Sequence, residues 1–386
     1  MTCSRNCGLG RLKRCKRRMV TLFNTYQHPK NRFDFWVIFR KCFGYGSICF
    51  GVFSLACCNQ ESSQEKPNLT ELSGSALGTT WSIKVLARKE FDPEQLRGEI
   101  VQKLEQAEKI FSHWRPDSEL SQWNANKSTT PLQVSPQLYE LIQHAQWMYR
   151  ETGGAFDPTI APLVNLWGFG PTTGRRSTIP KDEEITEVKK LTGMDNLEVL
   201  PKNKVRKKFS QLQLDFSSSA KGEIIDQICQ LLDRWALQNY LVEIGGEVRA
   251  HGRGKKGKGW IVGLEDGEMG KGLMLSVPLR NYAVATSGTY RLKKPNPKSA
   301  RNASHLLNPQ NGYPVEHHLI AVNAFAPTAR DADAWATALM IMGLEKGMQK
   351  AEEMDLVARF CELKDGITCI YSSTAYQRLF SAKNNL

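Results

Sequence analysis

The spacing of apolar residues predicts two amphipathic helices and one strand early in the main part of the chain. Between Pro93 and Phe111 the apolar positions recur every three or four residues, and the stretch from Pro136 to Glu151 repeats this spacing. Residues 80–87 alternate between apolar and polar side chains, which is typical of a half-buried strand. The chain therefore mixes helices and strands, and we find no internal repeat.

The second half of the sequence predicts hairpins. Val248 to Gly263 bracket a loop of glycine and lysine, and Val357 to Tyr371 bracket Lys364-Asp-Gly366. The first of these loops, Arg253 to Lys258, resembles a phosphate-binding loop in composition. No helix follows it, and we therefore interpret it as a solvated hairpin tip.

The turn of the C-terminal hairpin decides whether two cysteines meet. A three-residue loop places Cys361 directly opposite Cys369, where a disulfide is feasible in an exported protein. A two-residue Asp-Gly loop pairs Cys361 with Ile370 and puts the thiols on opposite faces. We favour the three-residue register and leave the disulfide itself open.

A segment from Leu214 to Asp226 collects unusual chemistry in one turn. Leu212 and Leu214 alternate with polar residues as in a strand, and a helical pattern begins after Gly222. Between them lie a carboxylate, three hydroxyls and an ammonium group, followed by a helix N-terminus that attracts anions. The turn suits a phosphate and a metal ion, although a plain serine helix cap has the same composition.

A second helix, Arg330 to Gly343, carries Asp333 and Thr337 four residues apart and hence on one face. A carboxylate and a hydroxyl together suit Mg²⁺, which favours oxygen ligands and commonly bridges to substrate phosphates. In the alternative interpretation Asp333 only complements the helix dipole. Upstream, the loop Thr152 to Thr159 precedes the aromatic stretch Leu166 to Gly170, a composition that suits a flat heteroaromatic ligand.

The charge of the chain is concentrated at its N-terminus. Residues 1–41 hold eleven Lys and Arg against Asp34 alone, and so carry +10 of the net +13. The rest of the chain is nearly neutral, which argues against nucleic acid as a partner. A basic start followed by the uncharged run Cys42 to Gln60 is typical of an export signal.

Two adjacent cysteines close this uncharged run. Because Leu55-Ala56 precede them, the site resembles a bacterial lipoprotein cleavage site, with Cys57 favoured slightly over Cys58 as the lipidated residue. An uncleaved anchor is the alternative, since the run is nearly long enough to span a membrane. We expect 1–56 to be the export segment, 57–74 the lipidated cysteine and polar tether, and 75–386 the catalytic domain. Cys229, Cys361 and Cys369 remain in that domain, without metal-ligand spacing.

The motifs taken together resemble the FAD:protein FMN transferase family, often called ApbE-like. Eight segments match in family order over roughly residues 75–375. They are Leu77 to Ile83, Phe111 to Asn124, Gly153 to Thr159, the Asp215 turn, Val242 to Glu247, Ala285 to Gly288, His305 to Gly312 and the Asp333 helix.

The resemblance implies a fold and a reaction. The fold is α+β, with antiparallel sheets flanked by helices in a two-lobed single body that holds the flavin site between its lobes. The reaction is transfer of the FMN half of FAD to a threonine or serine hydroxyl of an acceptor flavoprotein, with release of AMP. The protein's task is then to position the reacting groups and stabilise negative charge, for which Mg²⁺ is well suited.

The resemblance also implies roles for individual residues. Asp333, Thr337 and an oxygen of Ser218 would bind Mg²⁺, and Asp333 and His305 would be catalytic. The residues that would contact FAD are Leu77, Trp114, Ala155, Phe156, Asp157, Asp215, Lys221 and Leu306. Trp114 would stack on the isoalloxazine, and Ala155 to Asp157 would line the adenosine or flavin pocket. His305 suits proton removal from a hydroxyl, but a histidine that only hydrogen-bonds a phosphate would leave the same pattern.

Two other functions fit the same residues. A hydrolase would split FAD to FMN and AMP with water as the acceptor, and a non-catalytic lipoprotein would only store flavin. The resemblance suggests subunits of membrane redox complexes, or an exported flavoprotein, as acceptors. The expected location is the bacterial inner membrane, with a lipid anchor and the catalytic domain facing the periplasm.

Overall fold

The computed structural model describes residues 67–171, 178–267, 275–290, 293–294 and 303–381. The export segment, Cys57 and Cys58 lie outside this range. Within the described residues, no helix combines the length and apolar character that a membrane crossing needs.

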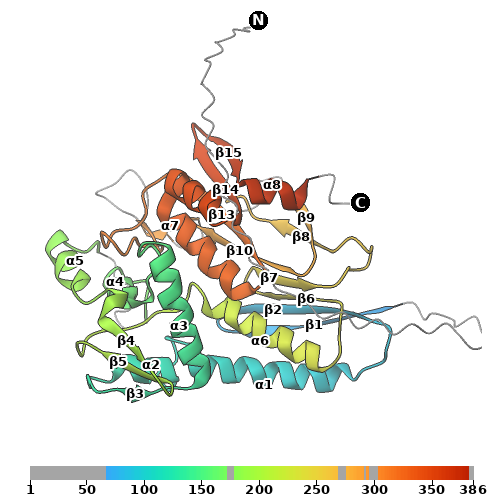
Figure 1. Ribbon diagram of the computed structural model, residues 1–386, viewed down its shortest axis with the longest axis horizontal. Coiled ribbons are helices and arrows are strands. Elements are labelled where there is room, and N and C mark those ends of the chain that lie inside the picture. Colours follow the sequence, from blue (N-terminus) through green and yellow to red (C-terminus); the bar gives the residue numbers. More distant parts are fainter. Residues whose placement is uncertain (1–66, 172–177, 268–274, 291–292, 295–302, 382–386) are drawn as a thin grey trace, which may run out of the picture. The chain divides into compact units, whose positions relative to one another are not determined.

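An eight-stranded antiparallel sheet forms the centre of the fold (Figure 1). Its strand order is β1-β2-β6-β7-β10-β13-β14-β15. The bounds are β1 Asn68–Ala76, β2 Thr79–Ala87, β6 Tyr240–Ile244, β7 Glu247–His251, β10 Tyr282–Gly288, β13 Leu319–Ala326, β14 Val357–Lys364 and β15 Ile367–Ser372. Three smaller sheets pair β3 Leu132–Gln133 with β5 Lys204–Lys207 and β4 Leu197–Leu200, β8 Trp260–Leu264 with β9 Leu275–Leu279, and β11 Lys293–Lys294 with β12 Ala303–Ser304.

Helices cover the sheet and provide most of the core. They are α1 Pro93–Phe111, α2 Glu119–Ala125, α3 Pro136–Glu151, α4 Ala161–Leu166, α5 Asp182–Lys189, α6 Ala220–Arg234, α7 Ala329–Glu353 and α8 Thr374–Phe380, with short 3-10 helices at Pro158–Ile160 and Met194–Asn196. The largest apolar cluster joins residues of α1, α3, α6 and α7 to the central sheet. A second cluster lies where β8, β9 and α8 pack against sheet residues such as Val284 and Phe325. The expected antiparallel sheet flanked by helices is confirmed.

The bounds of several helices agree with the local sequence signals. Both α1 and α3 have the predicted bounds, because each begins with proline after a capping residue, Asp92 or Ser135, whose side chain accepts backbone N–H groups. The helix predicted to end at Gly343 only breaks there, since Gly343 has φ 79° and helical residues resume beyond it. Leu212 and Leu214 are buried, but the strand expected around them is not formed, because this segment has no regular secondary structure.

Three predictions from the sequence are wrong. Residues 68–74, assigned to the tether, form most of β1 and pair with β2 along its whole length. Val248 to Gly263 is not a hairpin, because β7 pairs with β6 and β10 whereas β8 pairs with β9. The C-terminal hairpin has the two-residue loop, with Lys364 opposite Ile367 and Cys361 opposite Ile370.

The turn residues explain this hairpin register. Asp365 and Gly366 both have positive φ, 51° and 78°, which is the two-residue turn that Asp-Gly favours. Cys361 is buried and Cys369 is partly exposed, and both are free thiols. The disulfide is therefore not formed, because the thiols lie on opposite faces of the hairpin.

Candidate active site

A cavity of about 250 Å³ lies where the N-terminal ends of α6 and α7 meet the end of β10. Ten of the twelve predicted site residues line it, although they come from four separate parts of the sequence. These ten are Ala155, Phe156, Asp157, Asp215, Ser218, Lys221, His305, Leu306, Asp333 and Thr337. The fold thus brings together most of the residues that the sequence suggested, and leaves out Leu77 and Trp114.

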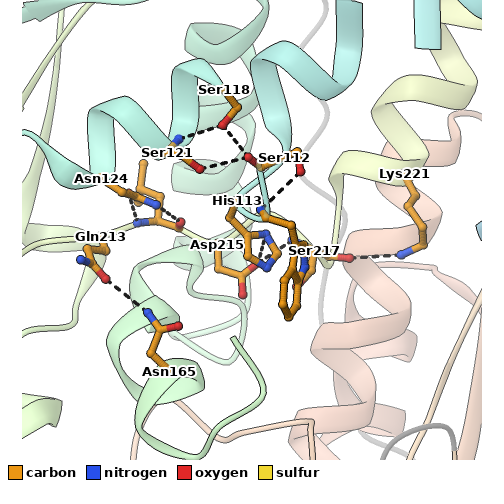
Figure 2. Close-up of polar contacts among 12 residues, drawn as sticks. Ser112, His113, Ser118, Ser121, Asn124, Asn165, Gln213, Asp215, Ser217 and Lys221 are labelled. Atoms are coloured by element: carbon orange, nitrogen blue, oxygen red, sulfur yellow. Dashed lines mark hydrogen bonds and ion pairs between the residues drawn. The ribbon is translucent and has the colours of Figure 1, made fainter. Parts of the chain in front are cut away.

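The Asp215 turn is held by its own side chains. The Asp215 carboxylate accepts the backbone N–H of Ser217 at 2.8 Å, and the Asp215 backbone N–H donates to the carbonyl of Pro158 at 2.7 Å. Nδ1 of His113 lies 3.5 Å from the same carboxylate, and Figure 2 shows the two side chains facing each other. This network fixes the turn just before α6 begins.

Lys221 lies in the first turn of α6 with its ammonium beside the cavity. Its Nζ donates to the carbonyl of Ser217 at 3.1 Å and lies 3.4 Å from Oε1 of Glu247 (Figure 2 shows the first contact). Both Lys221 and Glu247 line the cavity. The ammonium therefore supplies positive charge next to the N-terminus of α6, which suits a phosphate group.

Asp333 and Thr337 reach the cavity from one face of α7, as their spacing predicts. Oδ2 of Asp333 accepts the backbone N–H of Gly222 at 3.2 Å, and Oγ1 of Thr337 lies 3.0 Å from Oγ of Ser287. These contacts orient one carboxylate and two hydroxyls toward the same space, and Ser218 lines it as well.

The oxygen donors of this space fit Mg²⁺. Among the described residues, no group of three or more His, Cys, Asp or Glu side chains could hold a metal ion. A site here would therefore combine Asp333 with hydroxyl oxygens and water, the hard ligands that Mg²⁺ accepts. Oγ of Ser219, the residue after Ser218, is buried without a hydrogen-bond partner, but Ser219 is not among the residues that line the cavity.

Asp157 contributes a carboxyl group with a raised pKa to the cavity. It precedes a short 3-10 helix and accepts both the backbone N–H and the hydroxyl of Thr159, at 2.8 and 2.5 Å. Burial nevertheless raises the pKa of Asp157 to about 6, since desolvation outweighs these hydrogen bonds. Asp157 is thus much easier to protonate than an ordinary aspartate.

His305 and Leu306 also line the cavity. The His305 ring lies edge-on to Phe169, with 6.4 Å between ring centroids. This contact comes from the aromatic stretch noted in the sequence, and it places an aromatic wall behind the imidazole.

Leu77 and Trp114 do not belong to the cavity wall. Leu77 lies in the turn between β1 and β2 with φ 56°, and its N–H donates to Oε1 of Glu108 at 2.5 Å. Trp114 is 59% exposed, and its ring lies tilted at 43° to that of His113, with 5.2 Å between ring centroids. In this structure Trp114 is therefore a surface residue beside the Asp215 turn.

Sequence reasoning gave no role to several residues that the structure brings to the site. His113, Glu247 and Ser287 all contact a predicted site residue. Each lies inside one of the motifs quoted for the family resemblance. Their place in these motifs was the only sign in the sequence that they belong to the site, because neither spacing nor composition shows which distant residue a side chain contacts.

Two further cavities adjoin the first. One of about 130 Å³ shares Val164 and Asp215 with it and includes His113. The other, of about 440 Å³, shares Ala155 and Ile341 and is lined by Arg150 and Lys346 among others. The central cavity is small for a dinucleotide by itself, but the shared walls extend the space on both sides.

Comparison with known proteins identifies the family of the chain. The model of the ApbE family matches residues 77–360. The FAD:protein FMN transferase of Haemophilus influenzae is 33% identical over 341 residues, which cover 86% of this chain and 95% of the relative. The counterpart of Vibrio cholerae is 34% identical over 321 residues, which cover 82% of this chain and 95% of the relative.

Solved structures give the same result. The flavin transferase ApbE from Vibrio cholerae superimposes with a TM-score of 0.75 at 33% identity, covering 81% of this chain and 99% of that one. The apo flavinyl transferase ApbE of Pseudomonas stutzeri gives 0.76 at 34% identity, covering 82% and 98%. With the family model spanning most of the folded part and the site residues gathered in one cavity, the chain belongs to the ApbE family.

Proposed function

We propose that this protein transfers the FMN half of FAD to a threonine or serine hydroxyl of an acceptor flavoprotein and releases AMP. The observation that carries this proposal is the single cavity that combines Lys221, Asp333, Thr337 and Ser218. Such a set of one ammonium and several oxygen ligands suits a pyrophosphate, and the relatives named FAD:protein FMN transferase support the same assignment.

The reaction exchanges one phosphate ester bond for another. The acceptor hydroxyl oxygen attacks the phosphorus on the FMN side of the pyrophosphate, and the bond from that phosphorus to the bridging oxygen breaks. That oxygen leaves with AMP, and the hydroxyl proton passes to a base. No oxidation or reduction occurs, so the protein needs only to align the groups and offset negative charge.

Asp333, Thr337 and Ser218 are the residues that would hold Mg²⁺. When bound there, Mg²⁺ supplies charge neutralisation for the pyrophosphate and its leaving oxygen. The chain's own contribution is to orient these ligands: the Gly222 N–H fixes the Asp333 carboxylate, and Ser287 fixes the Thr337 hydroxyl. Lys221 adds a positive charge that does not depend on the metal.

His305 is our candidate for the base that takes the hydroxyl proton. Its position in the cavity wall supports this role, since the cavity also contains Lys221 and Asp333. Trp114 is our candidate for stacking on the isoalloxazine at the rim, which its exposed ring beside His113 allows.

The N-terminal sequence supports a lipid anchor. A basic start, an uncharged run and the cysteine pair Cys57 and Cys58 together suit an exported lipoprotein of the bacterial inner membrane, with the catalytic domain in the periplasm. Acceptors in this location would be exported flavoproteins or subunits of membrane redox complexes. Mass spectrometry of the mature N-terminus tests the anchor directly.

One experiment separates transfer from the two alternatives. The purified protein is incubated with FAD, Mg²⁺ and an acceptor domain that carries a serine or threonine flavinylation site. Covalent in-gel flavin fluorescence with one AMP released per flavin attached supports transfer. AMP release without fluorescent acceptor would identify a hydrolase, and FAD binding without AMP would identify a storage protein. An acceptor with the target residue changed to alanine is the matched control.

A further inference from the structure

A large groove lies at the opposite end of α6 from the catalytic cavity. Its volume is about 830 Å³, and its walls come from the end of β2, the segment between β2 and α1, the segment after α6 and the loop between β7 and β8. Because α6 has 15 residues, the two ends of this helix are about 22 Å apart at roughly 1.5 Å per residue. Figure 1 shows the course of this helix. The groove is therefore separate from the site that binds FAD.

The groove is basic and also has aromatic residues in its lining. Arg88, Lys89, Arg253 and Lys255 line it against a single acidic residue, Glu90. Phe91 and Trp235 also line the groove and meet edge to face, at 6.4 Å between ring centroids. The same β7–β8 loop also exposes Lys256 and Lys258.

Within the described part of the chain, these cations have no counterion: no salt bridge there involves Arg88, Lys89 or the basic residues of the loop Arg253 to Lys258. Some exposed lysines elsewhere are paired, such as Lys84 with Glu71 and Lys109 with Glu105, whereas others, such as Lys127 and Lys204, are exposed but stand apart from this groove. A cluster of uncompensated cations favours an anionic partner outside the molecule.

The loop is built to present side chains and not its backbone. The N–H of Gly254 donates to Oδ1 of Asn239, and the N–H of Gly259 donates to the carbonyl of Arg253. Gly254 has φ 61°, and a Cβ there would lie 2.4 Å from the carbonyl oxygen of Gly259. These backbone donors already have acceptors, so an anion would meet the ammonium and guanidinium groups instead. That arrangement suits a diffuse negative surface better than a single enclosed phosphate.

The position of Pro67 indicates that the anionic partner is a membrane surface. Pro67, which leads directly into β1, lines this groove. Cys57 lies ten residues earlier, and ten residues reach at most about 35 Å when fully extended. A lipid on Cys57 or Cys58 would therefore hold this end of the protein near the bilayer, where the basic side chains meet lipid headgroups.

We propose that this basic groove is a binding surface for anionic lipid headgroups, which turns the protein so that the catalytic cavity lies at the far end of α6 from the membrane. The argument from the tether rests on the proposed lipid anchor. The charge of the groove does not, and this allows the two to be tested separately.

The test uses residues 63–386 without the lipidated cysteine. These residues form one compact unit, and the solved Vibrio cholerae relative matches 81% of this chain over 99% of its own length, so this part folds without the N-terminal segment. Cosedimentation is measured with phosphatidylcholine vesicles that contain or lack phosphatidylglycerol. We expect binding only to the anionic vesicles, and weaker binding at high salt.

Charge variants locate the contact. K255S/K256S/K258S should weaken binding to anionic vesicles by about five-fold per lysine, and thus roughly a hundred-fold in total. The matched control K127S/K204S/K208S removes the same charge from exposed positions away from the groove and should leave binding nearly unchanged. Transfer of FMN to a soluble acceptor should be equal in both variants, since neither set lines the catalytic cavity.

Three results would overturn the proposal. Equal loss in both variants would mean that only total charge matters, and undiminished binding by K255S/K256S/K258S would place the contact elsewhere. Inorganic phosphate that binds the groove as tightly as the vesicles do would identify a site for a soluble anion. Failure of FMN transfer in all proteins would count against the proposed function and leave the vesicle result valid.

Discussion

Two buried aspartates on α6 and α7 make reciprocal contacts where the helix N-termini meet. Asp333 of α7 accepts the backbone N–H of Gly222 in the first turn of α6 at 3.2 Å. Asp226 of α6 accepts the N–H groups of Ala329 and Arg330 in the first turn of α7, at 2.9 and 3.0 Å. Each helix thus stabilises the start of the other, since the N-terminal N–H groups have no partner within their own helix.

The surroundings of the two aspartates differ. Asp226 also forms an ion pair with Arg249 and does not line the catalytic cavity, whereas Asp333 lines it beside Thr337. We infer that Asp226 holds the helices together and that Asp333 serves the reaction. Two aspartates that make the same kind of hydrogen bond therefore differ in role because of their other neighbours: an arginine for Asp226, and the catalytic cavity for Asp333.

The sharpest test of this difference is Asp333→Asn. Asparagine can still accept the Gly222 N–H, but it removes the charge that would bind the metal. We expect FMN transfer to fall on the order of a thousand-fold with the melting temperature nearly unchanged. Steady-state transfer rates at saturating Mg²⁺ check this, and a rate near that of the unmodified protein would refute the metal assignment.

The opposite result is expected for Asp226→Ala. The change leaves the Arg249 guanidinium and the N–H groups of Ala329 and Arg330 without their acceptor, and should lower the free energy of unfolding by about 3 kcal/mol. Denaturant unfolding measures the loss, while transfer by the protein that remains folded should persist. If Asp226→Ala destroyed transfer without changing stability, the two aspartates would not have separate roles.

Asp157 extends the comparison to a third buried carboxyl group. Because its pKa is raised from 3.8 to about 6 in the folded protein, the folded state keeps a proton that the unfolded state has lost across this window. Stability is therefore greater below this window and falls as pH rises through it, by up to about 3 kcal/mol. Asp157→Asn should remove this contribution. The unfolding free energy of the variant minus that of the unmodified protein should therefore increase from pH 4 to pH 6 and then level off. A difference that stays constant with pH would contradict the raised pKa.

The smallest expected effect concerns the close approach of the helices. A Cβ on Gly222 would lie 2.3 Å from the carbonyl oxygen of Ala329, so Gly222→Ala should push α6 and α7 apart. We expect a net loss of about 1–2 kcal/mol, since overpacking outweighs the gain in helix propensity. Gly98→Ala in α1 is the control: nothing lies within 4 Å of its Cβ position, so it should stabilise by up to about 1 kcal/mol. Equal thermal shifts for the two variants would contradict the close contact.

The sequence predicts the parts of this fold whose causes are local. The bounds of α1 and α3 follow from apolar spacing and from Asp92 and Ser135 as caps, and Asp333 and Thr337 share a face because they are four residues apart. The role of Asp226 was not predictable. An aspartate within a helical pattern gives no sign that its carboxylate accepts a backbone N–H group 103 residues away.

Strand pairing shows the same limit. Nothing in residues 248–263 reveals that β7 pairs with β10, more than 30 residues further on, and not with the neighbouring β8. The C-terminal hairpin is predictable as a hairpin, but its Asp-Gly turn suits both loop lengths, so the pairing of Cys361 could not be fixed locally.

The contact between Asp333 and Gly222 spans 111 residues of sequence, and this has a consequence for the order of folding. The Asp215 turn leaves the ribosome or a translocation channel long before α7 does. A chain that ends before residue 333 lacks the oxygen ligands Asp333 and Thr337, and the Gly222 N–H at the start of its α6 has no acceptor. Closing so long a loop is slow compared with forming either helix. Catalytic competence is therefore among the last properties the growing chain acquires, and a truncated or still unfolded chain has no assembled site with which to act on FAD.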